Sequence, residues 1–218
     1  MNESSDQFVG WVAILGGVIG VIGFISLLLM FIVGEPFGTV NDFLSIPTGL
    51  LMLPMVVTLY RLLAGEYPLP GLLALLAGIA GFLTTITGSI LLLTNRIDFQ
   101  LSLLPGIGGF GLIGLWVLIN SIIGLRSGAL PRGLAWVGIL LAVTPSMALL
   151  AVFRLESIAN GLTGMTGQTT GFQMSLPIMV VFLLGFISYA GLPIWFIALG
   201  RLFTLGRLGL AVGALSVS

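Results

Sequence analysis

The chain has 218 residues and no formal net charge, and its composition is 58% hydrophobic but only 6% charged. A mean hydropathy of +1.24 lies far above the range of water-soluble domains. The chain has no run of basic residues, so we expect no nucleic-acid partner. Histidine, cysteine and lysine are absent, which excludes disulfides, thiol catalysis, histidine-liganded metal or haem, and lysine Schiff bases.

Six apolar runs are each long enough for a helix to cross about 30 Å of hydrocarbon, which takes roughly 20 residues. They cover about 9–33, 43–63, 71–94, 105–125, 133–153 and 175–203. The sequence therefore predicts an all-α fold, a polytopic transmembrane helical bundle with six membrane-spanning helices, as a single domain over residues 1–218. The polar first seven residues lack the positive charge of a secretory signal, so we expect no cleavage there.

The first apolar run carries a glycine stripe. Gly16, Gly20 and Gly23 share one helix face, and this small-residue spacing lets two helices approach closely in lipid. The stripe fits either a homodimer contact or packing against another helix of the same bundle. Because glycine is common in membrane helices anyway, the second interpretation is favoured.

The second apolar run follows Asn41-Asp42. We interpret this pair as a helix N-cap, whose carboxylate suits the positive end of the helix dipole. Pro54 lies in the middle of the run, where it frees a backbone carbonyl and predicts a kink.

The third run places small and hydroxylated side chains at intervals of four residues. These are Ala77, Gly81, Thr85 and Ser89. The spacing turns them toward a neighbouring helix. They fit part of a polar solute path, but threonines in such positions more often bond their own backbone carbonyls or a neighbouring helix.

Residues 95–103 alternate between apolar and polar side chains, which predicts an extended segment at the membrane interface. Residues 106–111 then match the dinucleotide fingerprint G-x-G-x-x-G, but no strand or water-accessible crevice is expected there, so we assign these glycines to helix packing.

Asn120 is the most polar side chain far from a helix end. It is a candidate ligand contact, with an interhelical hydrogen bond as the alternative.

The fourth and fifth runs are joined by a short basic turn, residues 126–133. Gly128 is placed to stop one helix, and Pro131 suits the first turn of the next. The pattern RSGALPRGLAWVG resembles the corresponding turn of uncharacterised multi-pass prokaryotic membrane proteins, which are grouped as a domain of unknown function. The resemblance implies a multi-pass membrane protein and no particular activity.

The one long connection, the outer loop 154–174, begins with helical spacing of apolar residues and becomes rich in glycine, threonine and glutamine. It fits a binding loop or a disordered segment equally well.

Six spans place both termini on one membrane surface. Five arginines are expected on that surface, where they would contact lipid headgroups. They are Arg61, Arg126, Arg132, Arg201 and Arg207. The opposite surface has two, so we expect a cell (inner or plasma) membrane protein with cytoplasmic termini, although helix dipoles also draw arginine to C-terminal ends.

Charged residues lie in loops or near helix ends throughout the chain, which disfavours ion-coupled transport. The groups that intramembrane hydrolysis needs are missing, so we expect neither an enzyme nor a metal or cofactor site. The candidate ligand or partner contacts are Asn120, Asp42, Arg96, Asp98, Arg154 and Glu156. The repeated Arg-x-acid pairs at 96–98 and 154–156 fit a rim for a partner or lipid headgroup, or surface ion pairs of little consequence.

The leading hypothesis is a non-catalytic accessory, scaffold or lipid-binding subunit of a membrane assembly. Its partners would be membrane lipids and other membrane protein subunits, or a second copy of the chain. The alternative is a facilitative channel or carrier for a small uncharged or lipid-like solute, using the proline-containing second and sixth helices with Asn120. A solute flux in proteoliposomes would distinguish the two.

Overall fold

The computed structural model describes residues 3–63, 65–152 and 176–206. Its elements are α1 (Glu3–Val33), α2 (Phe37–Leu63), α3 (Pro68–Leu93), α4 (Phe99–Arg126), α5 (Arg132–Val152) and α7 (Leu176–Thr204). All six are long and apolar enough to cross a membrane. Within the described ranges every regular element is a helix and none is a strand, so the predicted all-α bundle of six spans is confirmed.

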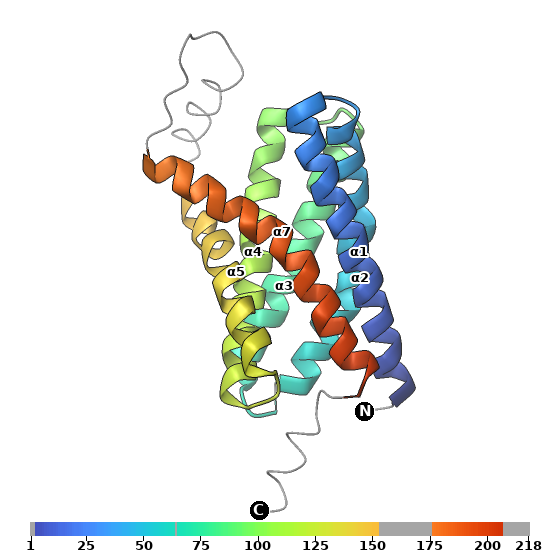
Figure 1. The fold of residues 1–218 in the computed structure, drawn as a ribbon, viewed down its shortest axis with the longest axis vertical. Helices are drawn as coiled ribbons and strands as arrows, with labels where there is room; N and C mark the ends of the chain where they lie inside the picture. The colour runs from blue at the N-terminus through green and yellow to red at the C-terminus, as the bar shows by residue number, and fades with distance from the viewer. Residues whose placement is uncertain (1–2, 64, 153–175, 207–218) are drawn as a thin grey trace, which may run out of the picture.

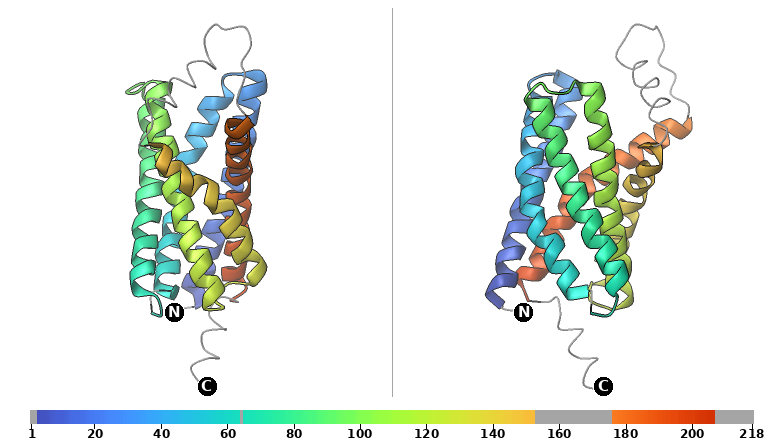
Figure 2. Two further views of the ribbon diagram at one scale, coloured as in Figure 1. Left: turned by 90° about the vertical axis from the view of Figure 1, so that its left-hand side faces the viewer. Right: turned by 180° about the vertical axis from the view of Figure 1, so that it is seen from behind.

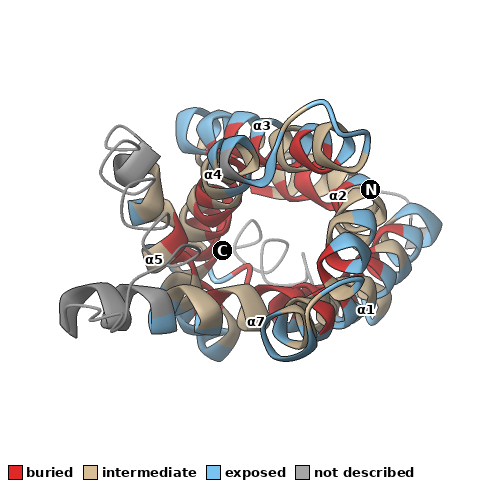
Figure 3. Ribbon diagram, turned by 90° about the horizontal axis from the view of Figure 1, so that it is seen from above, coloured by how far each residue is buried: buried red, intermediate tan, exposed pale blue. Residues whose placement is uncertain are grey.

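The six helices form a closed ring. Each packs on the next along the chain, α5 packs on α7, and α7 returns to pack on α1. Seen from above, the buried residues face the interior of the ring and the exposed residues face outward (Figure 3). Many outward side chains are large and apolar, for example Phe8, Ile32 and Leu140. An apolar outer surface of this extent is expected of a protein surrounded by lipid.

The two ends of the bundle carry different segments (Figure 1 and Figure 2). The start of α1, the end of α7 and the α2–α3 and α4–α5 turns lie at one end, which we call the terminal end. The α1–α2 and α3–α4 turns lie at the other, which we call the far end. α7 crosses the bundle obliquely, and its last turns lie beside the first turns of α1 (Figure 1).

Glycines bring α1 and α7 into backbone contact near the terminal end. A β-carbon added to Gly10 would lie 2.7 Å from the carbonyl oxygen of Gly200, and one added to Gly200 would lie 2.6 Å from that of Gly10. One added to Gly17, farther along α1, would lie 2.7 Å from the carbonyl oxygen of Pro193. Only glycine allows helices to come this close. Helices in lipid gain no hydrophobic free energy by associating, so close packing at small residues is what holds them together.

The predicted glycine stripe of α1 lies inside the bundle. A β-carbon on Gly16 would meet Met52 of α2, one on Gly20 would meet Pro193 of α7, and one on Gly23 would lie 3.6 Å from Asn41 of α2. These three glycines therefore pack against α2 and α7 of the same bundle, which is the interpretation that the sequence favoured, and they do not form a homodimer contact.

The predicted N-cap at Asn41-Asp42 is wrong. α2 begins at Phe37, so both residues lie inside the helix. The Glu35 carboxylate, two residues before the helix, serves the first turn instead, because its Oε2 accepts hydrogen bonds from the backbone N–H and the hydroxyl of Thr39, at 3.3 and 3.0 Å. This acidic side chain therefore satisfies one of the free N–H groups of the first turn and places negative charge at the positive end of the helix dipole.

The extended segment predicted for residues 95–103 is also wrong from Phe99 onward, where α4 begins. Asp98 is its N-cap, with extended backbone angles and a carboxylate oxygen that accepts the Leu101 N–H at 2.8 Å. Asn95 turns the chain with a φ of 54°. An alternation this short is overridden by a strong cap, because a satisfied first turn lets the helix start early.

Replacing Asp98 with alanine should lower the stability of the bundle by about 1 kcal/mol, because the Leu101 N–H loses its acceptor at the start of a membrane helix. Asp98→Asn keeps a side-chain oxygen at this position and should cost much less. The midpoint of thermal unfolding in one detergent measures both variants. If Asn and Ala lower the midpoint equally, the capping bond is not the source of the stabilisation.

The glycines and hydroxyls of α3 and α4 pack these helices against their neighbours. A β-carbon on Gly81 would lie 2.8 Å from the Ile113 nitrogen, and one on Gly111 would lie 3.0 Å from the Pro145 carbonyl oxygen. Thr85 donates its hydroxyl to the Gly81 carbonyl oxygen at 3.0 Å. The packing role assigned to the glycines of residues 106–111 is confirmed for Gly109 and Gly111, whereas a β-carbon on Gly106 would meet nothing within 4 Å. The backbone-bonding role assigned to the α3 threonines is confirmed for Thr85.

The basic turn between α4 and α5 also has the predicted form. Gly128 adopts a φ of 71°, which favours glycine and ends α4. The Leu130 side chain is buried, and its N–H donates to the Gly124 carbonyl oxygen at 3.1 Å. The turn is therefore folded back onto the bundle.

Candidate functional site

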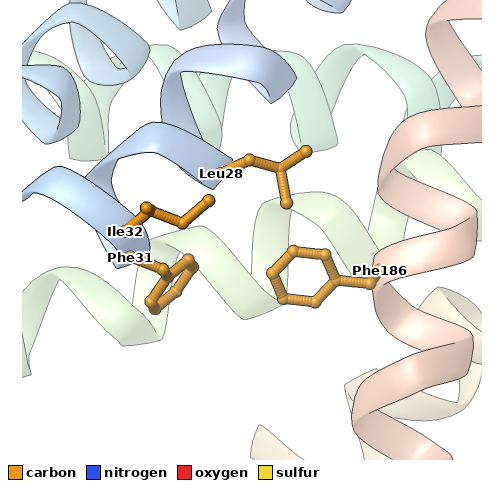
Figure 4. A pocket seen from close by; sticks show the side chains of 4 residues that line it. All are labelled: Leu28, Phe31, Ile32 and Phe186. Carbon is orange, nitrogen blue, oxygen red and sulfur yellow. The ribbon is translucent and has the colours of Figure 1, made fainter.

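An apolar groove lies between α1 and α7 near the far end. Its volume is about 270 Å³, and it is lined by Leu28, Phe31 and Ile32 of α1 and by Phe186 of α7 (Figure 4). Phe31 and Ile32 are exposed on the outer surface of the ring. This α1–α7 groove therefore opens sideways, toward the position of the lipid.

The groove follows from how the α1 sequence changes along its length. Near the terminal end, glycines hold α1 and α7 in backbone contact. Toward the far end, phenylalanines take their place: the Phe186 ring centroid lies 6.1 Å from that of Phe24 and 5.8 Å from that of Phe31. Because aromatic rings need far more room than glycines, the two helices are held apart here by side chains, and a hollow is left beside them.

A polar cluster lies one helical turn along α7 from the groove. The Tyr189 hydroxyl donates to Oδ1 of Asn41 at 3.3 Å, and the Ser45 hydroxyl donates to the Asn41 carbonyl oxygen at 3.0 Å. The Tyr189 ring also packs on Phe24 of α1 and Phe110 of α4, with centroids 6.0 and 5.1 Å apart. This Tyr189 cluster, residues Asn41, Ser45 and Tyr189, joins four helices across the interior of the ring.

Four aromatic side chains fill the interior on the terminal side of this cluster: Phe82, Trp116, Trp195 and Phe196. The Trp116 ring centroid lies 5.7 Å from that of Phe82, 6.4 Å from that of Trp195 and 6.0 Å from that of Phe196. Both tryptophans are only 1% exposed. We call this set the aromatic plug, and it closes the ring with packed rings drawn from α3, α4 and α7.

Charge is divided between the two ends of the bundle. Among the described residues the terminal end carries four arginines, Arg61, Arg126, Arg132 and Arg201, together with Glu3, Asp6 and Glu66. The far end carries a single described arginine, Arg96, together with Glu35, Asp42 and Asp98. Both ends carry three described acidic residues, so it is the shortage of arginine that gives the far end a net negative charge. Glu35 stands three residues after Ile32 of the groove.

The structure separates the residues proposed as ligand or partner contacts. Asn120 is 1% exposed, and its Nδ2 donates to the Trp116 carbonyl oxygen of its own helix at 2.7 Å. It lies beside the aromatic plug, whereas Asp42 follows Asn41 of the Tyr189 cluster. Arg96 and Asp98 are both exposed in the α3–α4 turn. Arg154, Glu156, Arg207 and the outer loop 154–174 lie outside the described residues.

The sequence did not single out the groove residues or Tyr189. Leu28, Phe31, Ile32 and Phe186 resemble any lipid-facing side chains, so nothing in the sequence marks them. Tyr189 carried a usable signal, because it is one of only three tyrosines and stands far from both ends of its run. A phenolic hydroxyl at that depth needs a partner, which points to an interhelical bond.

Three buried polar atoms have no hydrogen-bond partner in the described part of the chain: Thr48 Oγ1, Trp116 Nε1 and Ser121 Oγ. A β-carbon on Gly138 of α5 would collide with Ser121 Oγ and lie 2.8 Å from Trp195 Nε1, so tight packing leaves no room for a ligand there. The described part of the chain contains no group of three His, Cys, Asp or Glu side chains that could hold a metal ion.

No family model matches the chain, and no curated protein and no solved structure is significantly similar to it. Three features of the fold bear on its function: an apolar groove on the outer surface, an interior filled by aromatic rings, and a far end with few arginines.

Proposed function

We propose that this protein is a non-catalytic lipid-binding component of a membrane assembly, and that it holds the acyl chain of a membrane lipid in the α1–α7 groove. The observation that carries the proposal is the groove itself, an apolar hollow between two membrane-spanning helices that opens on the outer surface. Leu28 lies five residues before the end of α1, about 7 Å along the helix. At that depth the available apolar molecules are the upper parts of lipid chains.

The aromatic plug supports binding over permeation. A solute that crossed along the ring axis would have to displace four packed aromatic rings, two of them tryptophans with almost no exposed surface. Asn120, the polar residue considered for a solute path, donates its amide within its own helix. A groove on the side of the bundle needs no such path to hold a lipid.

The proposal includes an orientation, with the terminal end in the cytoplasm of a cell whose inner or plasma membrane holds the protein. Four described arginines lie at that end, as the positive-inside rule requires. Trp11 of α1 and Trp136 of α5 are exposed at the same end, Trp11 by 65%, and tryptophans favour the membrane interface. The groove then opens in the outer leaflet.

Filling the groove tests the proposal. In Ile32→Trp the indole should occupy the hollow, and the lipid that stays bound after extraction in mild detergent should fall about tenfold. Native mass spectrometry measures the bound lipid. Ile22→Trp is the matched control, because Ile22 is 48% exposed on α1 outside the groove, and it should retain lipid like the wild type. Equal lipid in all three proteins would refute the proposal.

A further inference from the structure

The two halves of α7, on either side of Pro193, are held in different ways. The terminal half packs into the interior of the bundle, where Trp195 is 1% exposed and Leu199 is fully buried. Gly200 of the same half makes the backbone contact with Gly10 of α1. Because these contacts belong to the close-packed core, the terminal half of α7 is fixed in the bundle.

The far half of α7 is held by aromatic rings and by a hydrogen bond to α2. Ile187 is 51% exposed, and a β-carbon added to Gly185 would meet nothing within 4 Å. The rings of Phe186 and Tyr189 pack on α1, and the Tyr189 hydroxyl donates to Oδ1 of Asn41 at 3.3 Å. Ring contacts and a single side-chain bond of this kind are weak in lipid, so this half is the more easily released.

Pro193 lies between the two halves and is itself held in place. A β-carbon on Gly17 would lie 2.7 Å from the Pro193 carbonyl oxygen, and one on Gly20 would lie 3.1 Å from its ring. Proline has no N–H, so the carbonyl oxygen of Tyr189, four residues earlier in α7, lacks its helical hydrogen bond. A helix bends most readily where this bond is missing. Pro193 is therefore a fixed point about which the far half of α7 can turn.

Phe24 of α1 connects the groove with the interior of the ring. Its ring centroid lies 6.1 Å from that of Phe186, which lines the groove, and 6.0 Å from that of Tyr189 in the Tyr189 cluster. Both contacts end when the far half of α7 moves away from α1. The groove then deepens toward the Tyr189 cluster, and more of a lipid chain fits between the two helices.

We infer that the far half of α7, residues 176–192, is a lateral gate for the lipid chain, which turns about Pro193 and is held closed by the Tyr189–Asn41 hydrogen bond. This inference rests on the proposed function, because it names how the α1–α7 groove is opened and closed. A chain in the groove favours the open form, since the open groove surrounds more of it. Opening and binding are thus linked, and a variant that opens more readily should also retain more lipid.

The distance between two spin labels measures the movement. The chain has no cysteine, so nitroxides attach only at introduced sites. Leu183→Cys on the far half of α7 is paired with Phe43→Cys on α2, because both native side chains are more than 60% exposed and neither lines the groove. In nanodiscs of dioleoyl phosphatidylcholine, electron paramagnetic resonance should give a main distance for the closed gate and a minor, longer one for the open gate.

Removing the hydrogen bond should enrich the longer distance. In Tyr189→Phe the fraction at the longer distance should rise about threefold, the population ratio that corresponds to one interhelical hydrogen bond in lipid. Ser188→Ala is the matched control, because the Ser188 hydroxyl donates to the Leu184 carbonyl oxygen of its own helix, and it should keep the wild-type distances. Equal longer-distance fractions in Tyr189→Phe and Ser188→Ala would overturn the inference.

Two further measurements locate the hinge. A label at Leu205→Cys, paired with the same label at Phe43→Cys, reports on the terminal half of α7 and should give one distance in every variant. Pro193→Ala restores an N–H for the Tyr189 carbonyl oxygen, so adding it to Tyr189→Phe should lower the longer-distance fraction. A second distance for the Leu205 pair, or a fraction that Pro193→Ala leaves unchanged, would mean that α7 does not turn at Pro193.

The gate and the proposed function fail in different ways. Tyr189→Phe should retain more lipid than the wild type after extraction, by up to threefold. If Ile32→Trp retains as much lipid as the wild type, the groove is not a lipid site and the gate has no chain to admit. If Ile32→Trp loses lipid but Tyr189→Phe changes neither the label distances nor the bound lipid, the groove binds lipid and only the gate is overturned. Thermal unfolding of each variant confirms that the compared proteins are folded.

Discussion

Replacing Gly200 with alanine should destabilise the bundle by about 1–3 kcal/mol, the usual cost of forcing extra atoms into a packed contact. The new β-carbon would lie 2.6 Å from the Gly10 carbonyl oxygen and 3.0 Å from the Ile14 nitrogen. Both obstacles are backbone atoms of α1, so no side-chain rotation can relieve them. The two helices must move apart at the contact that closes the ring.

The control for this prediction is on the same helix. A β-carbon added to Gly185 of α7 meets nothing within 4 Å, and alanine is the better helix former by about 1 kcal/mol. Gly185→Ala should therefore match or exceed the wild-type midpoint of thermal unfolding, while Gly200→Ala falls below it. If both variants unfold at the wild-type midpoint, the α1–α7 backbone contact does not hold the ring closed.

The membrane spans could be predicted from the sequence because lipid imposes one strong rule: backbone polar groups must be bonded inside each segment, and apolar length then defines a span. The ends of the helices obey weaker, local rules. Asn41-Asp42 and Glu35 offer competing caps six or seven residues apart, and the sequence alone does not rank them. Asp98 likewise outweighed the alternation that surrounds it.

The groove could not be predicted, because it depends on which helices are neighbours. The glycine stripe of α1 indicated a close helix contact, but only the fold identifies the partner helices as α2 and α7. Phe186 lies more than 150 residues after Phe31 in the chain, and the hollow exists only where the two rings meet. Lipid-facing residues have no pattern that separates a groove wall from an ordinary outer surface.

The aromatic plug provides the second large effect, since Trp195→Ala should cost about 2–3 kcal/mol. This cost lies at or below the low end of the range measured when a buried tryptophan is replaced by alanine. It is small because the side chains of separated helices stay in lipid, so little free energy of transfer from an apolar interior to water is involved. The loss is of packing on Trp116 and Phe196, with centroids 6.4 and 5.8 Å away, and of the Nε1 hydrogen bond to the Leu134 carbonyl oxygen at 3.0 Å. That bond joins α7 to α5.

Two further variants separate the causes. Trp195→Phe keeps an aromatic ring but removes the N–H, so it should lose only about 0.6 kcal/mol, the usual worth of an interhelical hydrogen bond in lipid. Trp11→Ala removes an equally large side chain from the outer surface and should leave the unfolding midpoint nearly unchanged. The order expected for thermal unfolding in one detergent is therefore Trp11→Ala, Trp195→Phe and then Trp195→Ala, from most to least stable. A Trp195→Ala variant as stable as Trp11→Ala would mean that the packed aromatic rings do not support the interior of the ring, and these rings would then not oppose the passage of a solute.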